Sequence, residues 1–265
     1  MMKKYLQVVT STWGEISTYR FNFTMWRIRN VLQLLTVYFL WLTVTPVKGQ
    51  LFGYSQPLIL TYVLGVSLIS SVVLSTRTAE IGENIDSGNL SLFLVRPLNY
   101  FLYWFARDLG DKAVNIVFVI VELFLFFLIL KPPLFIQSHA SFLLLTLIAI
   151  ALALLLNFFI GCLLGFVGFW SSEVWAPRFI YFILIGFLSG GAFPLDIFPQ
   201  WLQGIFHFSP FTYLLYFPLK IYLGALSPEQ IAQGMLIAVA WVAILYFATK
   251  VVWLRGLKVY SAQGN

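Results

Sequence analysis

Long apolar runs, separated by short polar or proline-containing segments, cover most of this 265-residue chain. A helix needs about 20 predominantly apolar residues to cross the hydrocarbon core of a bilayer. Six windows approach this length, at about Ile28–Val47, Pro57–Ser75, Ala113–Leu130, Phe142–Phe169, Phe179–Phe193 and Ile231–Trp253. The pattern therefore predicts an all-α membrane protein, with six transmembrane helices in a single domain over residues 1–265.

The composition supports a membrane protein and argues against a soluble one. Hydrophobic residues make up 60% of the chain and charged residues only 10%, against about 45–50% and 25% in soluble domains. The net charge of +6 does not indicate a nucleic-acid partner, because the basic residues are dispersed around the apolar runs. The single cysteine, Cys162, excludes a disulfide within the chain.

The basic residues also predict the orientation in the membrane. With six crossings, both termini lie on the same side, and thirteen of the sixteen lysines and arginines fall on that side. Only Lys48, Lys131 and Lys220 fall on the other. Because cytoplasmic segments are enriched in Lys and Arg, we expect a multi-pass protein with both termini in the cytoplasm.

The first 27 residues mix aromatic and basic side chains ahead of the first apolar run. Trp13, Tyr19, Phe21, Phe23 and Trp26 alternate with basic residues at positions 20, 27 and 29. Aromatic rings at headgroup depth and basic groups facing anionic lipid are typical of a helix that lies in the cytoplasmic interface. The alternative is an ordinary aromatic belt at the start of the first span.

Residues 76–112 form the most polar part of the chain, including the stretch RTAEIGENIDSGNLSLFLVRPLN. Ile81 and Ile85 share one helical face, while polar groups occupy the others. Gly88 can end such a helix in the left-handed conformation, and Pro97 suits the first turn of the next helix. We expect a short, rigid amphipathic helix on the cytoplasmic side; a solvated loop is the alternative.

Residues 188–224 are apolar but repeatedly interrupted. Glycine and proline divide this segment into pieces too short to span a bilayer, at Gly190, Gly191, Pro194, Pro199, Pro210 and Pro218. Broken backbone at membrane depth must be shielded by protein or line a cavity. We therefore expect a re-entrant helical hairpin on the outer face, with an external loop as the alternative.

The order of these features resembles the ABC-2 type transporter permeases, and most closely the small six-span exporter subunits of bacteria. The resemblance covers nearly the whole chain. It is carried by Ile85, Gly88, Leu90, Arg96, Pro97 and Leu98 in the cytoplasmic segment, and by Gly191, Pro194, Phe198, Pro199, Pro210 and Phe211 in the outer hairpin.

The resemblance implies a function that this chain performs only with partners. The polar segment would be a coupling helix that docks on a separate ATPase subunit, through Glu80, Ile81, Glu83, Asn84, Ile85 and Ser87. A second permease, identical or paralogous, would complete the translocation pathway in the bacterial inner membrane. ATP and Mg²⁺ would bind to the partner ATPase.

The sequence contains no recognisable catalytic or nucleotide-binding motif. There is no phosphate-binding Gly-x-x-x-x-Gly-Lys-Ser/Thr loop and no nucleophile elbow or zinc-protease motif. His139 and His207 are isolated, with no residues at metal-ligand spacing. We expect a transport subunit without its own ATPase activity, cofactor or metal.

Glu122 is the ionisable residue in the most apolar surroundings. Together with Asp108, Asp111 and Asn115 it falls within about 60° on one helical face. Two interpretations remain open: a substrate path along Asn115, Glu122 and Asn157, or a structural acid that is protonated or hydrogen-bonded between helices, for example to Asn157.

Two further questions stay open from the sequence. Gly161 and Gly165 form a Gly-x-x-x-Gly pair that permits close helix packing, either within the subunit or in a dimer. Two functions remain as alternatives to an exporter permease: an ion-coupled secondary transporter that uses Glu122, and a membrane scaffold protein. Substrate identity cannot be read from these residues.

Overall fold

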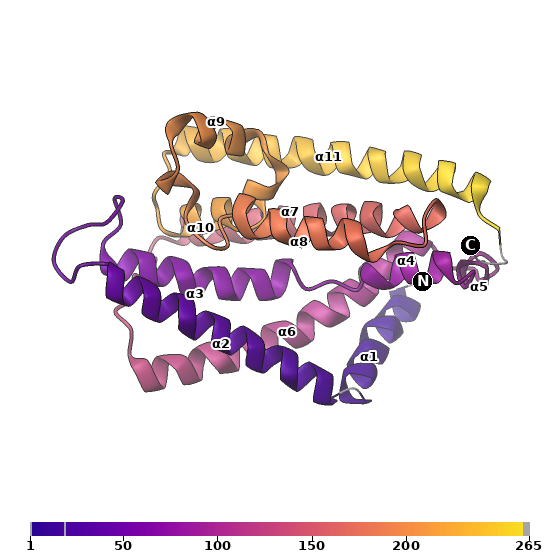
Figure 1. The fold of residues 1–265 in the computed structure, drawn as a ribbon, viewed down its shortest axis with the longest axis horizontal. Helices are drawn as coiled ribbons and strands as arrows, with labels where there is room; N and C mark the ends of the chain where they lie inside the picture. Colours follow the sequence, from indigo (N-terminus) through magenta and orange to yellow (C-terminus); the bar gives the residue numbers. More distant parts are fainter. Residues whose placement is uncertain (1, 19, 262–265) are drawn as a thin grey trace.

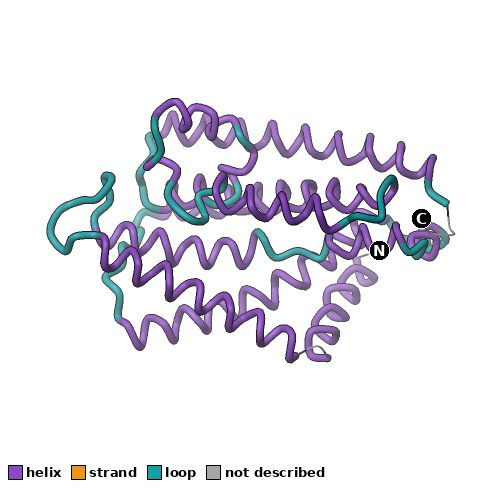
Figure 2. The backbone as a smooth tube through the Cα atoms, in the orientation of Figure 1, coloured by secondary structure: helices purple, strands orange, loops and turns teal. Residues whose placement is uncertain are grey.

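The computed structural model describes residues 2–18 and 20–261. Tyr19, one of the aromatic residues assigned above to the interface, lies outside them. Throughout the described residues the secondary structure is helical, apart from an isolated bridge between Leu51 and Tyr54 (Figure 2). The all-α prediction is therefore confirmed.

Six long helices run roughly along one common axis (Figure 1). They are α2 (Arg20–Val44), α3 (Gln56–Val73), α6 (Tyr100–Leu130), α7 (Ala140–Gly165), α8 (Trp175–Leu188) and α11 (Pro228–Val259). A short 3₁₀ helix, η1 (Phe166–Phe169), continues α7. Helix α1 (Met2–Thr18) crosses one end of this bundle, where α4 (Ala79–Asp86), α5 (Leu90–Leu94) and the C-terminal segment also lie.

Four helices are long and apolar enough to cross a membrane: α3, α6, α7 together with η1, and α11. Helix α8 is apolar but has only 14 residues. Helix α2 has 25 residues but carries three arginines. A multi-pass helical membrane protein is thus shown, with four clear spans among the described residues.

Several helix boundaries differ from the predicted spans: α6 begins thirteen residues before Ala113, and α8 ends at Leu188, not at Phe193. The first long helix, α2, already begins at Arg20, so residues 20–27 are continuous with it; the interfacial position of residues 1–27 stays a prediction. The prediction that Pro97 lies in the first turn of the next helix is wrong. Helix α5 intervenes, and α6 begins only at Tyr100, where the Asn99 side chain accepts a hydrogen bond from the Leu102 amide (3.0 Å).

Buried apolar side chains form two clusters. The larger lies among α3, α7 and α10 (Tyr216–Tyr222) and includes Leu60, Leu156 and Leu214. The smaller lies at the α4 end of the bundle and includes Ile81, Ile85, Leu90, Trp104 and Phe166. The second cluster attaches the short helices α4 and α5 to the long ones.

The interrupted segment between α8 and α11 folds as predicted into short pieces. They are η2 (Leu195–Ile197), α9 (Gln200–Phe208), η3 (Pro210–Tyr213) and α10. None of them is long enough to span a bilayer. They gather at the end of the bundle opposite α4 (Figure 1), and whether they re-enter the membrane stays a prediction.

Candidate functional site

Helix α4 packs with its apolar face against the end of α7. Ile81, Gly82 and Ile85 are buried there, as the alternation of polar and apolar residues predicted. The contact is close because the opposing surface is made of glycines. A Cβ atom added at Gly165 would lie 2.8 Å from the Ile81 Cβ, and one at Gly168 would lie 2.8 Å from the Gly82 carbonyl oxygen.

The Gly-x-x-x-Gly pair of α7 is therefore used within the chain. Gly161 faces the Thr78 side chain, and Gly165 faces Ile81. Both contacts involve the α4 segment, so of the two alternatives left open by the sequence these residues follow packing within the subunit. The two glycines let the short helix α4 approach the apolar helix α7 at backbone distance.

Arginines on both sides of Glu80 hold α4 to its neighbours. The Glu80 carboxylate accepts from Arg77 Nη1 at 3.0 Å and pairs with Arg107 Nη2 at 3.0 Å. Arg77 also pairs with Asp111 (3.0 Å), and Arg107 with Glu15 (2.7 Å). Because Glu15 belongs to α1, and Arg107 and Asp111 to α6, this ion-pair network joins α1, α4 and α6.

The charge on Arg77 is secured by its surroundings. Burial lowers the pKa of Arg77, but the carboxylates of Asp111 and Glu80 raise it, and the net shift is upward. Arg77 therefore stays charged at any physiological pH.

Hydrogen bonds fix both ends of α4. Before the helix, the Thr78 carbonyl accepts from Arg178 Nη2 of α8 (2.6 Å). After it, Gly88 takes the left-handed conformation (φ +75°), as predicted. The Tyr260 hydroxyl, just past α11, donates to the Gly88 carbonyl (2.6 Å) and accepts from the Ser91 amide (3.0 Å).

The residues predicted to contact an ATPase differ in exposure. Ile81 and Ile85 are buried, and Glu80 is half-buried within its ion pairs. Asn84 is half-buried and donates to the Glu80 carbonyl (2.7 Å). Only Glu83 and Ser87 of this set are exposed. The solvent-facing part of α4 is accordingly smaller than the sequence pattern indicated.

Glu122 lies opposite an arginine of α2. Arg27 Nε donates to Glu122 Oε1 (2.6 Å), and Arg27 Nη2 pairs with Glu122 Oε2. The remaining guanidinium nitrogen, Nη1, donates to Asn115 Oδ1 (3.3 Å). Arg27 is only 5% exposed, so its assignment to a lipid-facing basic group is wrong. The sequence offered only a weak signal, an arginine at the edge of the first apolar run and an acid within the third.

Asn157 is not part of this arrangement. Its side-chain oxygen accepts from the Tyr181 hydroxyl of α8 (2.9 Å). Of the three residues named as path candidates, the structure brings together Asn115 and Glu122 but not Asn157. The partner of Glu122 is Arg27.

A cavity of about 880 Å³ opens next to Asn115, at the α4 end of the bundle. Its walls are both polar and aromatic, and they are made by Glu15, Asn22, Phe23, Trp26, Leu74, Ser75, Thr76, Arg77, Ala79, Glu80, Asp111 and Asn115. No group of three potential metal ligands occurs within residues 2–18 and 20–261.

At the opposite end, the residues predicted to form the outer hairpin serve as break points and packing groups. Pro194 and Pro199 immediately precede η2 and α9, and Pro210 is the first residue of η3. Phe198 packs on Phe206. Gly191 lies in the turn after α8, and Phe211 contacts Tyr181.

Two charged residues missed by the sequence analysis tie this end together. Lys220 Nζ lies 2.9 Å from Asp196 Oδ2 and donates to the Tyr54 hydroxyl (3.2 Å). Tyr54 in turn donates to Asp196 (2.9 Å). Lys220 is buried, so this cluster connects α10, η2 and the segment before α3.

Comparison with known proteins identifies the family. Residues 31–264 match the family described as ABC-2 family transporter protein. No curated protein matches the chain. Because the family match covers most of the sequence and agrees with the apolar membrane-length helices, this chain belongs to the ABC-2 family of transporter proteins.

Proposed function

We propose that this chain is the permease subunit of an ATP-binding cassette exporter. It forms half of the translocation pathway and couples to a separate ATPase subunit, which binds ATP and Mg²⁺. Membership of the ABC-2 family supports the proposal. The observation that carries it is α4, a short helix outside the clear spans that is fixed to them on several sides.

The contacts of α4 suit a helix that transmits movement. It packs on the glycines of α7, is ion-paired to α1 and α6, and its leading residue Thr78 is held by Arg178 of α8. A displacement of α4 by an ATPase would therefore move several membrane helices together. A loosely attached loop would absorb the same displacement.

The proposed topology has six crossings, with α2 and α8 added to the four clear spans. Arg27 is compatible with a membrane position for α2, because Glu122 compensates its charge. Both termini then lie in the cytoplasm of a bacterial cell, with the protein in the inner membrane. A second permease, identical or paralogous, supplies the other half of the pathway.

Measurement of ATP hydrolysis tests this function. The purified chain alone is expected to hydrolyse no ATP above background, whereas its complex with a co-purifying ATP-binding cassette protein hydrolyses ATP and exports. The control is the same complex with the phosphate-loop lysine of the ATPase replaced. Turnover by the isolated chain, or no association with the ATPase, would overturn the proposal.

A further inference from the structure

The cavity of about 880 Å³ at the α4 end of the bundle carries an excess of negative charge. Three carboxylates line it, those of Glu15, Glu80 and Asp111. Within the described part of the chain they pair with two arginines, Arg77 and Arg107. The wall of the cavity therefore has one more negative charge than positive charge.

Neighbouring ion pairs leave this excess unchanged. Asp108 pairs with Lys112 at 3.0 Å, and Glu122 pairs with Arg27. Each of these pairs is neutral by itself. A cation that enters the cavity therefore meets more negative than positive charge.

The wall that α2 contributes to the cavity is aromatic. Phe23 and Trp26 both line it, and because they are three positions apart they share one face of the helix. Their ring centroids lie 6.2 Å apart. The face of an aromatic ring attracts a cation, and more strongly where water is displaced. Aromatic rings beside an excess carboxylate charge suit a cation that carries an apolar body.

In the proposed topology the cavity lies at the cytoplasmic edge of the hydrocarbon core. Between Arg29 and Lys48 eighteen residues carry no charged side chain, close to the about 20 that a spanning helix needs. Phe23 and Trp26 precede Arg29 by less than two helical turns, at the level of the headgroups. Amphiphilic cations collect at this level, because their apolar part enters the lipid and anionic headgroups attract their charge.

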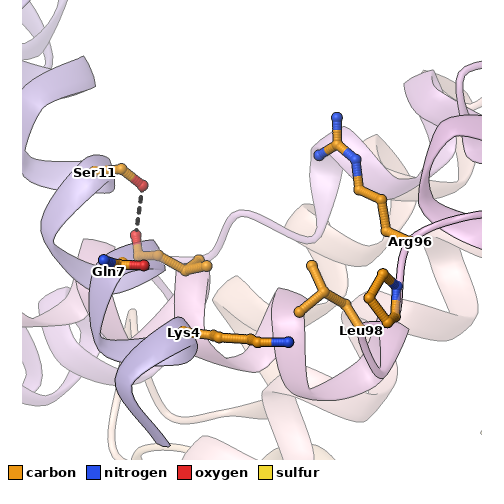
Figure 3. Close-up of a pocket in the computed structure, with 7 residues that line it drawn as sticks. Lys4, Gln7, Ser11, Arg96 and Leu98 are labelled. Atoms are coloured by element: carbon orange, nitrogen blue, oxygen red, sulfur yellow. Dashed lines mark hydrogen bonds between the residues drawn. The ribbon is translucent and has the colours of Figure 1, made fainter. Parts of the chain in front are cut away.

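A second, smaller hollow has the opposite charge. This groove of about 490 Å³ is lined by Lys4, Gln7, Val8, Ser11, Arg96, Pro97 and Leu98. Figure 3 shows Lys4 extending from α1 toward Leu98, with Arg96 on the opposite wall. Neither Lys4 nor Arg96 forms an ion pair within the described residues, unlike Arg77 and Arg107. A cation is therefore repelled from the groove and attracted to the larger cavity.

We propose that the larger cavity binds an organic cation with an apolar body, and that the exporter takes up such a substrate there from the cytoplasmic leaflet. The carboxylates of Glu15, Glu80 and Asp111 supply the excess negative charge, and the rings of Phe23 and Trp26 cover the apolar body. This inference rests on the proposed function, which it extends by naming a substrate class and a site.

Equilibrium binding of radiolabelled tetraphenylphosphonium tests the inference. This probe is a permanent cation surrounded by aromatic rings, and it is added to the purified full chain in uncharged dodecyl maltoside micelles. The wild-type chain is expected to bind it saturably, without the ATPase. Absence of saturable binding would overturn the inference.

Two lysine variants of α2 test whether the bound cation lies in the cavity. Asn22→Lys adds a positive charge at an exposed position of the wall, and binding should weaken at least about tenfold because like charges repel at close distance. The matched control is Met25→Lys, which changes an exposed residue of the same helix that does not line the cavity, and it should bind as the wild type does. Equal affinities of the two variants would contradict the inference.

Two further substitutions separate the contribution of charge from that of the rings. Glu15→Gln removes the excess negative charge, while its amide oxygen can still accept from Arg107, and should weaken binding at least about threefold. Trp26→Leu should weaken binding about fivefold. The matched controls are Glu173→Gln and Trp175→Leu, both at exposed positions outside the cavity. Unchanged affinity in both cavity variants would exclude the site.

The outcomes separate this inference from the proposed function. A chain that associates with its ATPase and hydrolyses ATP in the complex, but binds no tetraphenylphosphonium, overturns the inference alone. A chain that binds the cation through these residues but does not associate with an ATPase supports the cation site and overturns the proposed function. Displacement of tetraphenylphosphonium by added phosphatidylethanolamine would assign the cavity to a lipid headgroup and overturn the uptake of substrate there.

Discussion

At the scale of single residues, most charges near the membrane helices are used within the chain. Arg27 is paired with Glu122, and Arg77 and Arg107 share Glu80. A buried charge is tolerated only when it is paired or hydrogen-bonded. The Glu122 ion pair therefore favours a structural role for this residue, and weakens the alternative of an ion-coupled transporter.

Replacement of Glu122 by Leu is expected to destabilise the protein by about 3–5 kcal/mol, because Arg27 is left buried without its charge partner. The double replacement Arg27→Leu with Glu122→Leu should be less destabilising than Glu122→Leu alone. Unfolding in detergent measures both. A structural role predicts that the double variant still exports, whereas loss of export by a stable double variant would favour a role of Glu122 on the substrate path.

Glu80 and Glu83 are expected to respond differently to charge reversal. Glu83→Lys changes an exposed side chain, so stability should remain near that of the wild type, while association with the ATPase weakens through wrong-sign charges. Glu80→Lys places a third cation beside Arg77 and Arg107 and should lower the melting temperature. Equal melting temperatures for both variants would contradict the ion-pair network.

At the scale of elements, the position of α4 depends on the absence of side chains on α7 and η1. Gly165 and Gly168 face Ile81 and the Gly82 backbone, respectively. The surface that contacts α4 is formed jointly by the end of α7 and its 3₁₀ extension η1, each of which contributes one of these glycines. The position of α4 therefore depends on close backbone packing as well as on charges.

Replacement of Gly168 by Ala is expected to displace α4, because the added Cβ would lie 2.8 Å from the Gly82 carbonyl oxygen. Overpacking of this kind typically destabilises by about 1–3 kcal/mol, and ATP hydrolysis should become uncoupled from export. Gly204→Ala is the control, since nothing lies within 4 Å of its added Cβ. Normal coupling in Gly168→Ala would show that α4 tolerates displacement.

At the scale of the whole molecule, the two ends of the bundle are built differently. One end carries α1, α4, α5 and the C-terminal segment, joined by ion pairs and by Tyr260. The other carries the short pieces η2 to α10, joined by Lys220 and Asp196. In the proposed topology these ends face the cytoplasm and the outside, respectively.

Cysteine labelling from outside the cell tests this orientation. A cysteine at Gln200 is expected to react with a membrane-impermeant thiol reagent, because Gln200 is exposed at the start of α9. Leu195 is buried, so a cysteine there should react slowly and serves as a control for accessibility. Labelling of Gln200→Cys only after the membrane is opened would reverse the proposed orientation.

Local pattern alone determined the membrane class, the helical fold and the places where helices break. Lipid requires long apolar runs, and clustered prolines and glycines favour helix breaks, so these features depend on near neighbours in the chain. The amphipathic α4, its end at Gly88 and the division of residues 188–224 were predictable for this reason.

Tertiary structure alone decided which distant residues meet. Arg27 and Glu122 are 95 positions apart, and Glu80 is shared by arginines of two different segments. A helical pattern shows which face is apolar, but not which helix covers it, because that choice depends on the packing of all the helices together. The same packing left Leu92, Leu94 and Val95 exposed, although these apolar side chains resemble those of a buried helix.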